Sequence, residues 1–297
     1  MQTIRTGRNH ISPALRRQKA LGYFRPRTLA EALAVLDAES PVVAAGCTDL
    51  FPARPGPELI GQVLDITNIN EMTGISQRAG GWRIGAAVSW SELAQAELPP
   101  AFDGLKQAAR EVGAIQIQNM GTLGGNLCNA SPAADGVPPL LTLGADVELV
   151  SRAGSRLLPL ADFILGPRRT ALKKGELLTA IHLRQAEGRS AFRKLGARRY
   201  LVISIVMAAV RIAEEDGLIS EAALSIGACS PVAVRLPALE AALLGKPLAE
   251  AAGFDADLLQ GALTPLTDIR ADAAYRSHAA AELLRRALSG LAEGGAK

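Results

Sequence analysis

The stretch from Val112 to Asp135 reads Val-Gly-Ala-Ile-Gln-Ile-Gln-Asn-Met-Gly-Thr-Leu-Gly-Gly-Asn-Leu-Cys-Asn-Ala-Ser-Pro-Ala-Ala-Asp. Three glycines, Gly121, Gly124 and Gly125, crowd one short segment between apolar residues. Because glycine has no Cβ, such a segment lets backbone N–H groups come close to a ligand. Successive N–H groups in a turn form a concave nest that suits phosphate oxygens. The stretch therefore predicts a loop that binds phosphate, here called the second bend (residues 121–126).

Polar side chains in this stretch are uncharged until its end. The uncharged hydrogen-bonding side chains are those of Thr122, Asn126, Asn129 and Ser131. Asp135 adds a carboxylate able to accept from a ribose hydroxyl or a ring N–H. No Lys or Arg lies between Arg110 and Arg152, so backbone dipoles would have to hold a phosphate here. The pattern is neither Gly-x-Gly-x-x-Gly nor a Walker loop, and a plain turn between two elements is the alternative.

Composition indicates a globular protein with a basic start. The chain has 297 residues, 48% of them hydrophobic and 21% charged, which suits about two domains. The net charge is +3, yet residues 1–30 hold seven Lys and Arg and no acid. We interpret residues 1–20 as a basic tail, able to dock on an acidic partner subunit. The tail lacks interleaved aromatic residues, which argues against nucleic acid, and it lacks the apolar region of a secretory signal.

The cysteines indicate free thiols. Cys47, Cys128 and Cys229 are odd in number and far apart, without a Cys-x-x-Cys pair. The sequence therefore predicts no zinc site and no iron–sulfur cluster on this chain. We expect a reducing, cytoplasmic compartment. The longest apolar run, residues 201–210, is too short to span a bilayer.

The order of expected elements favours an α+β fold. Thr28, with Glu31 three residues later, predicts the start of a helix within residues 21–37. Strands are expected at 41–44, 63–66, 82–86, 146–151, 176–183 and 222–228, and helices at 102–112, 138–143 and 235–292. A polar linker is expected at 185–190. Strands come first and helices last within each half, which favours α+β layers over a doubly wound parallel sheet.

Several motifs together resemble a known family. Ala44–Leu50 reads Ala-Ala-Gly-Cys-Thr-Asp-Leu, and the stretch 118–135 follows later in the chain. Lys194–Arg199 and the late segment 268–284 are further matches in the same order. Over roughly residues 22–291, the chain resembles the FAD-binding medium subunit of the molybdenum hydroxylases, the xanthine dehydrogenase and carbon monoxide dehydrogenase type.

The resemblance implies a fold and a cofactor site. It implies a two-subdomain FAD-binding domain of the vanillyl-alcohol oxidase type at 21–185, and a small C-terminal α+β domain, an antiparallel sheet with helices, at 190–292. A first bend (residues 45–50) and the second bend would both lie on FAD. Carried over by position, the cofactor-binding residues are Val43, Ala44, Ala45, Gly46, Cys47, Thr48, Asp49, Leu50, Val112, Thr122, Leu123, Gly124, Gly125, Asn126, Cys128, Asn129, Asp135, Leu178 and Lys194.

Some of these positions have a more specific implied place. Asp49, Cys128 and Asn129 match positions that border the isoalloxazine ring. Arg199 and Tyr200 fall in the loop that guards the electron-acceptor side of the flavin.

The implied activity is electron transfer. FAD on this chain would take electrons from 2Fe-2S clusters of an iron–sulfur small subunit and pass them to an external acceptor, while a molybdopterin large subunit oxidises the substrate. The expected assembly is a dimer of heterotrimers. Because the flavin carries the chemistry, no catalytic residue and no metal site are expected on this chain. The alternatives are a self-contained FAD-dependent NADPH reductase of related fold, and a non-catalytic subunit that has lost FAD.

The sequence also departs from the family pattern. Cys47 stands where the first bend usually has its second glycine, and it would be the lesion in a subunit without FAD. Gln118 replaces a common arginine. Tyr200, Leu201 and Val202 stand where xanthine dehydrogenases carry aspartates, which weakens the case for NAD as the acceptor.

Other polar residues have plainer interpretations. His10, His182 and His278 are isolated in the sequence, and we expect them to be structural. Arg198 and Arg199 would hold either a dinucleotide phosphate or a carboxylate of a partner.

Overall fold

The computed structural model describes residues 22–53, 61–199 and 201–294. Apolar side chains in these residues form two main cores, one before and one after residue 190. We call the parts that hold them the N-terminal half (22–184) and the C-terminal half (189–294). The predicted basic tail, His10 and Tyr200 lie outside the described residues.

A small parallel sheet with strand order β1-β3-β2 begins the N-terminal half. Its strands are β1 (Gly22–Phe24), β2 (Val42–Ala44) and β3 (Gln62–Asp65). Helix α1 (Leu29–Glu39) begins at the predicted capping box, in which the Thr28 side chain accepts from the N–H of Glu31 and the Glu31 carboxylate accepts from that of Thr28. The chain leaves β2 directly into the first bend, so this sheet fixes where the bend starts.

A five-stranded antiparallel sheet follows, with strand order β4-β5-β10-β6-β7. Its strands are β4 (Ile75–Arg78), β5 (Gly81–Gly85), β6 (Asp146–Ser151), β7 (Gly154–Pro159) and β10 (Leu177–Arg184). Strand β10 lies in the middle and is almost fully buried, as its apolar run predicts. The sequence did not predict β7, because this edge strand is mostly exposed and lacks β-branched residues.

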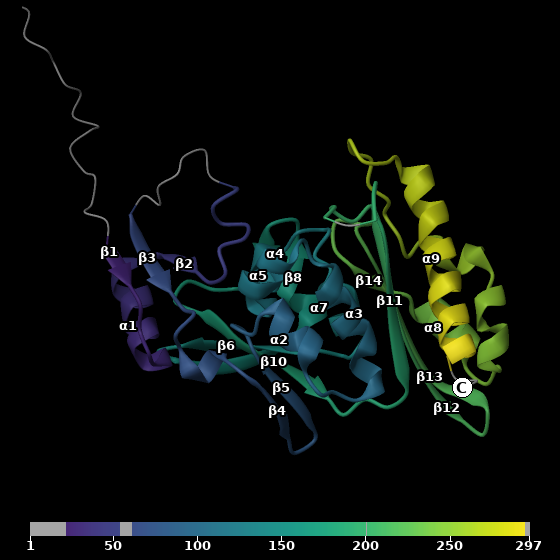
Figure 1. The fold of residues 1–297 in the computed structure, drawn as a ribbon, viewed down its shortest axis with the longest axis horizontal. Helices are drawn as coiled ribbons and strands as arrows, with labels where there is room; N and C mark the ends of the chain where they lie inside the picture. Colours follow the sequence, from purple (N-terminus) through teal and green to yellow (C-terminus); the bar gives the residue numbers. More distant parts are fainter. Residues whose placement is uncertain (1–21, 54–60, 200, 295–297) are drawn as a thin grey trace, which may run out of the picture.

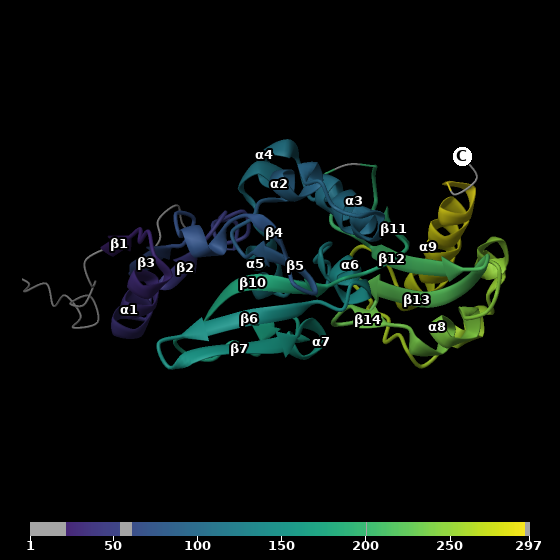
Figure 2. The same cartoon turned by 90° about the horizontal axis from the view of Figure 1, so that it is seen from below.

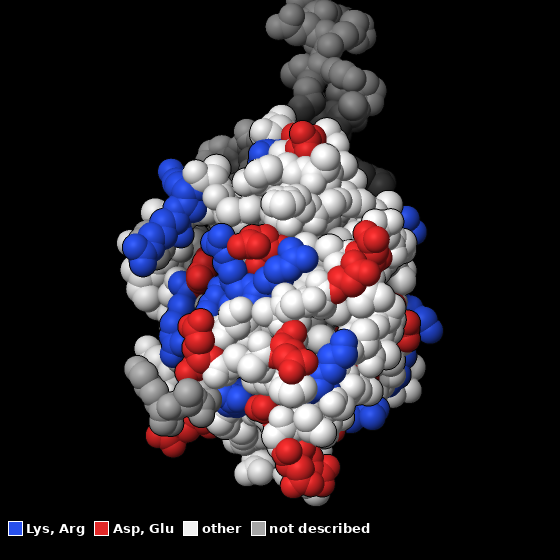
Figure 3. Space-filling model, turned by 90° about the vertical axis from the view of Figure 1, so that its right-hand side faces the viewer, with Lys and Arg blue, Asp and Glu red and all other residues white. Residues whose placement is uncertain are grey.

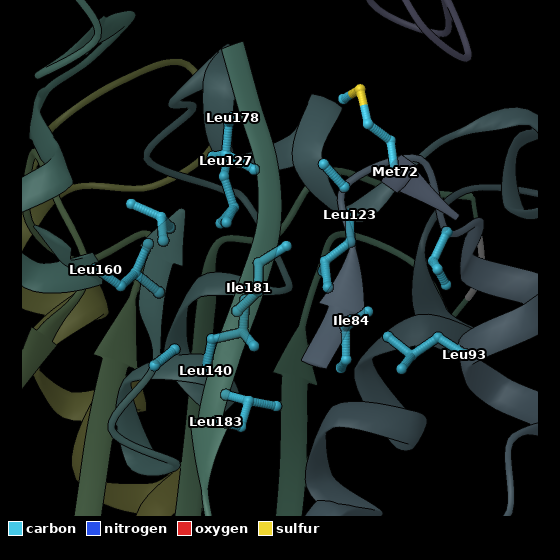
Figure 4. Close-up of a cluster of buried hydrophobic side chains, with 14 of the residues drawn as sticks. Met72, Ile84, Leu93, Leu123, Leu127, Leu140, Leu160, Leu178, Ile181 and Leu183 are labelled. Atoms are coloured by element: carbon cyan, nitrogen blue, oxygen red, sulfur yellow. The ribbon is translucent and has the colours of Figure 1, made fainter. Parts of the chain in front are cut away.

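Short helices lie beside this sheet, and α5 packs directly on its central strand β10 (Figure 2). The elements are η2 (Asn70–Met72), α2 (Trp90–Gln95), η3 (Pro100–Phe102), α3 (Asp103–Glu111), α4 (Ile115–Met120), α5 (Leu123–Asn129), α6 (Val137–Thr142) and α7 (Leu160–Phe163), with the small strands β8 (Ile164–Gly166) and β9 (Arg169–Thr170). In the core, Leu123 and Leu127 of α5 lie close to Leu178 and Ile181 of β10 (Figure 4). This packing fixes the second bend against the sheet.

The second bend is not the loop that its glycines predict. Helix α5 begins at Leu123, so Gly124 and Gly125 lie in its first turn. The Thr122 side chain caps the helix by accepting from the N–H of Gly125 at 3.0 Å. Leu123 and Leu127, which are one turn apart, are both fully buried, and their burial offsets the low helix propensity of glycine.

The C-terminal half is an antiparallel sheet with helices, shown on the right in Figure 1. The strand order is β11-β12-β13-β14. Its elements are β11 (Arg189–Leu195), β12 (Val206–Glu215), β13 (Leu218–Gly227), β14 (Val234–Arg235), α8 (Pro237–Leu243), η4 (Leu248–Gly253), η5 (Ala256–Leu259) and α9 (Ala273–Gly294). The helical prediction for 235–292 is wrong over 260–272, where Gly261 has a φ of 80° and Pro265 cannot continue a helix.

The α+β prediction is confirmed by these sheets and helices. No helix in the described part of the chain is long and apolar enough to cross a membrane. On the face of the C-terminal half that Figure 3 shows, basic and acidic side chains are interspersed.

Candidate cofactor-binding site

A cavity of about 810 Å³ opens where the two bends face the C-terminal half. The predicted residues that line it are Val43, Ala45, Gly46, Cys47, Thr48, Asp49, Leu50, Val112, Thr122, Gly124, Gly125, Asn126, Cys128, Asn129, Asp135, Leu178 and Lys194. Ala44 and Leu123 do not line it, because they pack into the core with 5% and 0% of their surface exposed. The structure therefore brings together residues that lie up to 151 positions apart in the chain.

The first bend presents unengaged backbone amides. Within the described residues, the N–H groups of 46–50 have no hydrogen-bond acceptor. All five of these residues line the cavity. Residues 46–50 are half-buried or exposed at the cavity, so their N–H groups are open to a solute, and a row of five donors without an acceptor in the described part of the chain suits a ligand rich in acceptor oxygens.

The second bend differs, because its amides are already used. The N–H of Leu123 donates to the Val88 carbonyl at 2.9 Å, and that of Gly124 donates to the Ala86 carbonyl at 2.8 Å. The N–H groups of Gly125 and Asn126 donate to the side chain and the carbonyl of Thr122. The predicted phosphate nest is therefore wrong for residues 123–126, since the start of α5 and the contact with residues 86–88 occupy these donors.

Two features of the second bend still face a ligand. Within the described residues, the N–H of Thr122 has no acceptor. The buried Oδ1 atom of Asn126 likewise has no hydrogen-bond partner in the described part of the chain. An orphaned buried acceptor costs about 1–3 kcal/mol, which a donor from a bound molecule would recover.

The two bends touch each other. A Cβ added to Gly46 would overlap the carbonyl oxygen of Met120, and it would come within 2.9 Å of the Cα of Gly121. A Cβ on Gly121 would in turn approach the Thr48 hydroxyl at 3.3 Å. Glycine at position 46 therefore lets the bends close on one side of the cavity.

The sequence predicts that the Asp135 carboxylate is free to accept from a ligand, but the structure shows it paired within the protein. Its Oδ2 accepts from Nζ of Lys194 at 2.7 Å, and its Oδ1 accepts from the Ser204 hydroxyl at 2.5 Å. Burial raises the pKa of the Asp135 carboxyl, and the nearby Lys194 charge and the two hydrogen bonds offset part of that rise. Nζ of Lys194 also donates to the Glu111 carbonyl at 3.2 Å, so the pair joins both halves of the chain.

Cys128 and Asn129 end helix α5 at the cavity. Cys128 is open to the cavity, yet surrounding protein atoms raise the pKa of its thiol to about 12, which keeps it protonated. The Asn129 side chain accepts a hydrogen bond from Arg168, whose guanidinium also donates to the Asn129 carbonyl at 3.3 Å. Arg168 lies in the turn between β8 and β9 with a φ of 58°.

Sequence reasoning missed Arg168, Glu176 and Ser204. The first two line the cavity, and the third contacts Asp135. Pro167 before two arginines indicates a basic turn, but nothing in the sequence tells which wall that turn reaches. Glu176 is held by Arg156, with Oε1 at 2.8 Å from Nε.

The histidines lie elsewhere. His182 is at 2.6 Å from a Glu148 carboxylate oxygen on the five-stranded sheet, and His278 is exposed on α9. Neither lines the cavity. Among the described residues, no group of three His, Cys, Asp or Glu could hold a metal ion.

The cavity lies between the N-terminal half and the β11–β12 connection, and its row of backbone amides without an acceptor among the described residues suits the class of nucleotide-binding proteins. Comparison with known families makes this specific. Residues 18–184 match the FAD binding domain in molybdopterin dehydrogenase, and residues 190–291 match the CO dehydrogenase flavoprotein C-terminal domain. The chain belongs to this family of FAD-binding oxidoreductase subunits, and the resemblance inferred from the two bends is confirmed.

Similar proteins cover nearly the whole chain. The putative xanthine dehydrogenase FAD-binding subunit XdhB of Escherichia coli (strain K12) is 29% identical, covering 90% of this chain and 94% of its own length. The nicotinate dehydrogenase FAD-subunit of Eubacterium barkeri is 33% identical, covering 77% of this chain and 81% of its own.

Solved structures show the same fold. A chain of carbon monoxide dehydrogenase from Hydrogenophaga pseudoflava superposes with a TM-score of 0.82 at 28% identity, covering 90% of this chain and 96% of that one. A chain of quinoline 2-oxidoreductase from Pseudomonas putida 86 gives a TM-score of 0.82 at 27% identity, covering 94% and 99%. The relatives are named as subunits or medium chains, so they belong to assemblies of more than one kind of chain.

Proposed function

We propose that this chain is the FAD-carrying electron-transfer subunit of a multi-subunit molybdenum hydroxylase. It would take electrons from 2Fe-2S clusters of an iron–sulfur small subunit and pass them to an external acceptor. The family membership and the subunit names of its relatives support this proposal. Bound FAD supplies the redox chemistry, because a flavin exchanges electrons singly or in pairs.

The observation that carries the proposal is the row of open amides at residues 46–50. These donors suit the diphosphate of FAD, since successive backbone N–H groups bind anionic oxygens without a Lys or Arg. Nearer the C-terminal half, the cavity holds Lys194 and Asp135, and Asn126 offers an acceptor that no described residue pairs with. On this basis we propose the nineteen predicted positions as the cofactor site. Ala44 and Leu123 would support it from the core without contacting the cavity.

The cavity offers little acid–base chemistry for a carbon substrate. Among the described lining residues, the carboxylates are those of Asp49, Asp135 and Glu176. Asp135 is paired with Lys194, and Glu176 with Arg156. Asp49 carries the remaining carboxylate, at a position that the resemblance puts beside the isoalloxazine ring, so the preference for an electron carrier over a self-contained NADPH reductase rests on the family and on the subunit names of the relatives.

The remaining parts of the proposal concern the assembly. We propose a molybdopterin large subunit as the site of substrate oxidation, a dimer of heterotrimers, and a cytoplasmic location. We also propose that the FAD-binding domain spans 21–185 and the C-terminal domain 190–292, which agrees with the separate cores of the two halves.

Purification of the native complex tests the proposal. The chain is expected to come down yellow, with one FAD per chain, together with an iron–sulfur chain and a molybdopterin chain. A chain without flavin would point to the non-catalytic alternative. A chain that alone oxidised NADPH at full rate with a carbon substrate would point to the reductase alternative.

A further inference from the structure

One buried carboxylate joins the two halves at the cavity. Asp135 lies just before α6 in the N-terminal half, and both of its partners come from the C-terminal half. Lys194 is near the end of β11, and Ser204 is just before β12. The side chains of Lys194 and Asp135 are 5% and 9% exposed, and Ser204 is 2% exposed.

Lys194 and Ser204 lie at opposite ends of the connection between β11 and β12. The strands meet there, because Leu195 pairs with Val206 and the N–H of Ile205 donates to the Leu195 carbonyl at 2.7 Å. Asp135 therefore binds both ends of the connection with its two oxygens. This two-point contact fixes the plane of the carboxylate.

We propose that Ser204 is a positioning residue of the cofactor site, which holds the Asp135 carboxylate in place and so couples flavin binding to the seating of the C-terminal half. This proposal rests on the proposed function. Ser204 does not line the cavity, so its effect passes through Asp135.

The physical reason is the cost of an unpaired buried oxygen. Without the Ser204 hydroxyl, Oδ1 of Asp135 would lose its only donor among the described residues. A buried carboxylate oxygen without a donor destabilises the ionised form. The carboxyl would then take up a proton more easily or turn away, and Lys194 would lose part of its partner.

Few other charges act on this carboxyl. From β11, Lys194 faces it directly. From α3, Glu111 lies near enough that burial and, to a smaller extent, the charge of Asp135 raise the pKa of the Glu111 carboxyl, while Lys194 lowers it. Arg193 acts on Glu111 from the same strand as Lys194. The Ser204 hydroxyl is thus an uncharged donor that, together with Lys194, lowers the pKa of the Asp135 carboxyl against the rise caused by burial.

The ligand-free chain gives the first test. The Asp135 carboxyl is titrated by carbon-13 NMR in the wild type, Ser204→Ala and Ser204→Thr, with Asp135→Asn used for assignment. The pKa of Asp135 is expected to rise in Ser204→Ala, because a hydrogen bond to the ionised form is lost. It is expected to return toward the wild-type value in Ser204→Thr, which keeps the hydroxyl.

FAD affinity gives the second test. Ser204→Ala is expected to bind FAD about fivefold more weakly at neutral pH, the size of one net hydrogen bond. Because the pKa of Asp135 is raised in this variant, the carboxyl becomes protonated sooner as the pH is lowered. The FAD affinity of the variant is therefore expected to begin to fall at a higher pH than that of the wild type. Ser204→Thr is expected to restore both the affinity and the pH at which it falls.

Ser190→Ala is the matched control. Ser190 is 5% exposed, and its hydroxyl accepts from the Gly104 N–H at 2.8 Å, so it joins the same two halves at the other end of β11. The control is expected to lower the melting temperature without moving the Asp135 pKa or the FAD affinity. An equal pKa shift in Ser190→Ala, or none in Ser204→Ala, would overturn the proposal.

The two proposals fail in different ways. If the wild type binds FAD and Ser204→Ala binds it equally at every pH, the role of Ser204 is wrong and the proposed function stands. If the NMR shift occurs but the wild type binds no FAD, the proposed function is wrong.

Discussion

The two bends contain similar residues and use their backbones in opposite ways. In the first bend, the N–H groups of 46–50 have no acceptor within the described residues. In the second bend, those of 123–126 all donate to the protein. The difference teaches that a glycine-rich segment predicts a close approach, but does not tell whether a ligand or the protein itself comes close.

The neighbouring elements explain the difference. The first bend leaves a three-residue strand and turns without starting a helix, so no acceptor in the described part of the chain takes the N–H groups of 46–50. The second bend starts α5, whose cap and whose contact with residues 86–88 take the donors one by one. We therefore expect the first bend to bind the cofactor and the second to shape the wall against which it lies.

The largest expected effect comes from Gly46→Ala. The new Cβ would overlap the Met120 carbonyl, which is backbone and cannot turn aside. We expect the free energy of unfolding to fall by about 3 kcal/mol, and FAD binding to be lost as the first bend moves away. Urea unfolding and flavin content of the purified chain measure the two effects. Normal flavin content in this variant would break the assignment of the first bend.

A smaller effect separates Gly124 from Gly125. A Cβ on Gly124 would meet the Ala86 Cβ at 2.6 Å and the Ala86 carbonyl at 2.7 Å, whereas a Cβ on Gly125 would meet the Thr122 hydroxyl at 2.8 Å. We expect Gly124→Ala to lower the stability of the ligand-free chain by about 2 kcal/mol.

Gly125→Ala serves as the matched control. We expect it to change stability by less than about 1 kcal/mol, since alanine favours the helix and a side-chain hydroxyl can shift. Urea unfolding without FAD measures both variants. If Gly124→Ala kept the stability of the wild type and lost only FAD binding, the second bend would bind the phosphates of FAD, contrary to our expectation.

The smallest expected effect is a gain from Cys47→Gly. Cys47 has a φ of 58°, a left-handed conformation that costs a residue with a Cβ about 1 kcal/mol. Glycine removes that cost but loses more entropy on folding, so we expect a net gain of about 0.5 kcal/mol in stability. Thermal unfolding measures it, with Cys47→Ala as the control that keeps the Cβ. A gain in Cys47→Ala as large as in Cys47→Gly would show that the sulfur, and not the backbone, is the cause.

Local patterns were sufficient to predict many of the elements. The Thr28 capping box gave the start of α1, and the apolar run of β10 gave the central strand. The α+β order was readable for the same reason, because periodicity and turn residues are local signals. Edge strand β7 and helix α5 were missed, since the first has a weak pattern and the second depends on burial of Leu123 and Leu127.

The candidate site could be predicted only in part. The two bends were found from their residues and from the family resemblance, and most of the predicted positions line one cavity. Which amides are open could not be found, because the acceptors at Ala86 and Val88 lie far from the second bend in the sequence. The contacts of Ser204 and Arg168 depend on tertiary folding in the same way.

A small third cluster links the cores of the two halves. It packs Ala108 of α3 with Phe192, Met207 and Ala209 of the C-terminal sheet. Cutting the chain between β10 and β11 would strip this cluster on both sides and leave Phe192 facing water. The chain should therefore unfold in one cooperative transition. A shortened version ending near residue 185 would expose apolar surface and aggregate, so it would be unsuited to reconstitution with flavin.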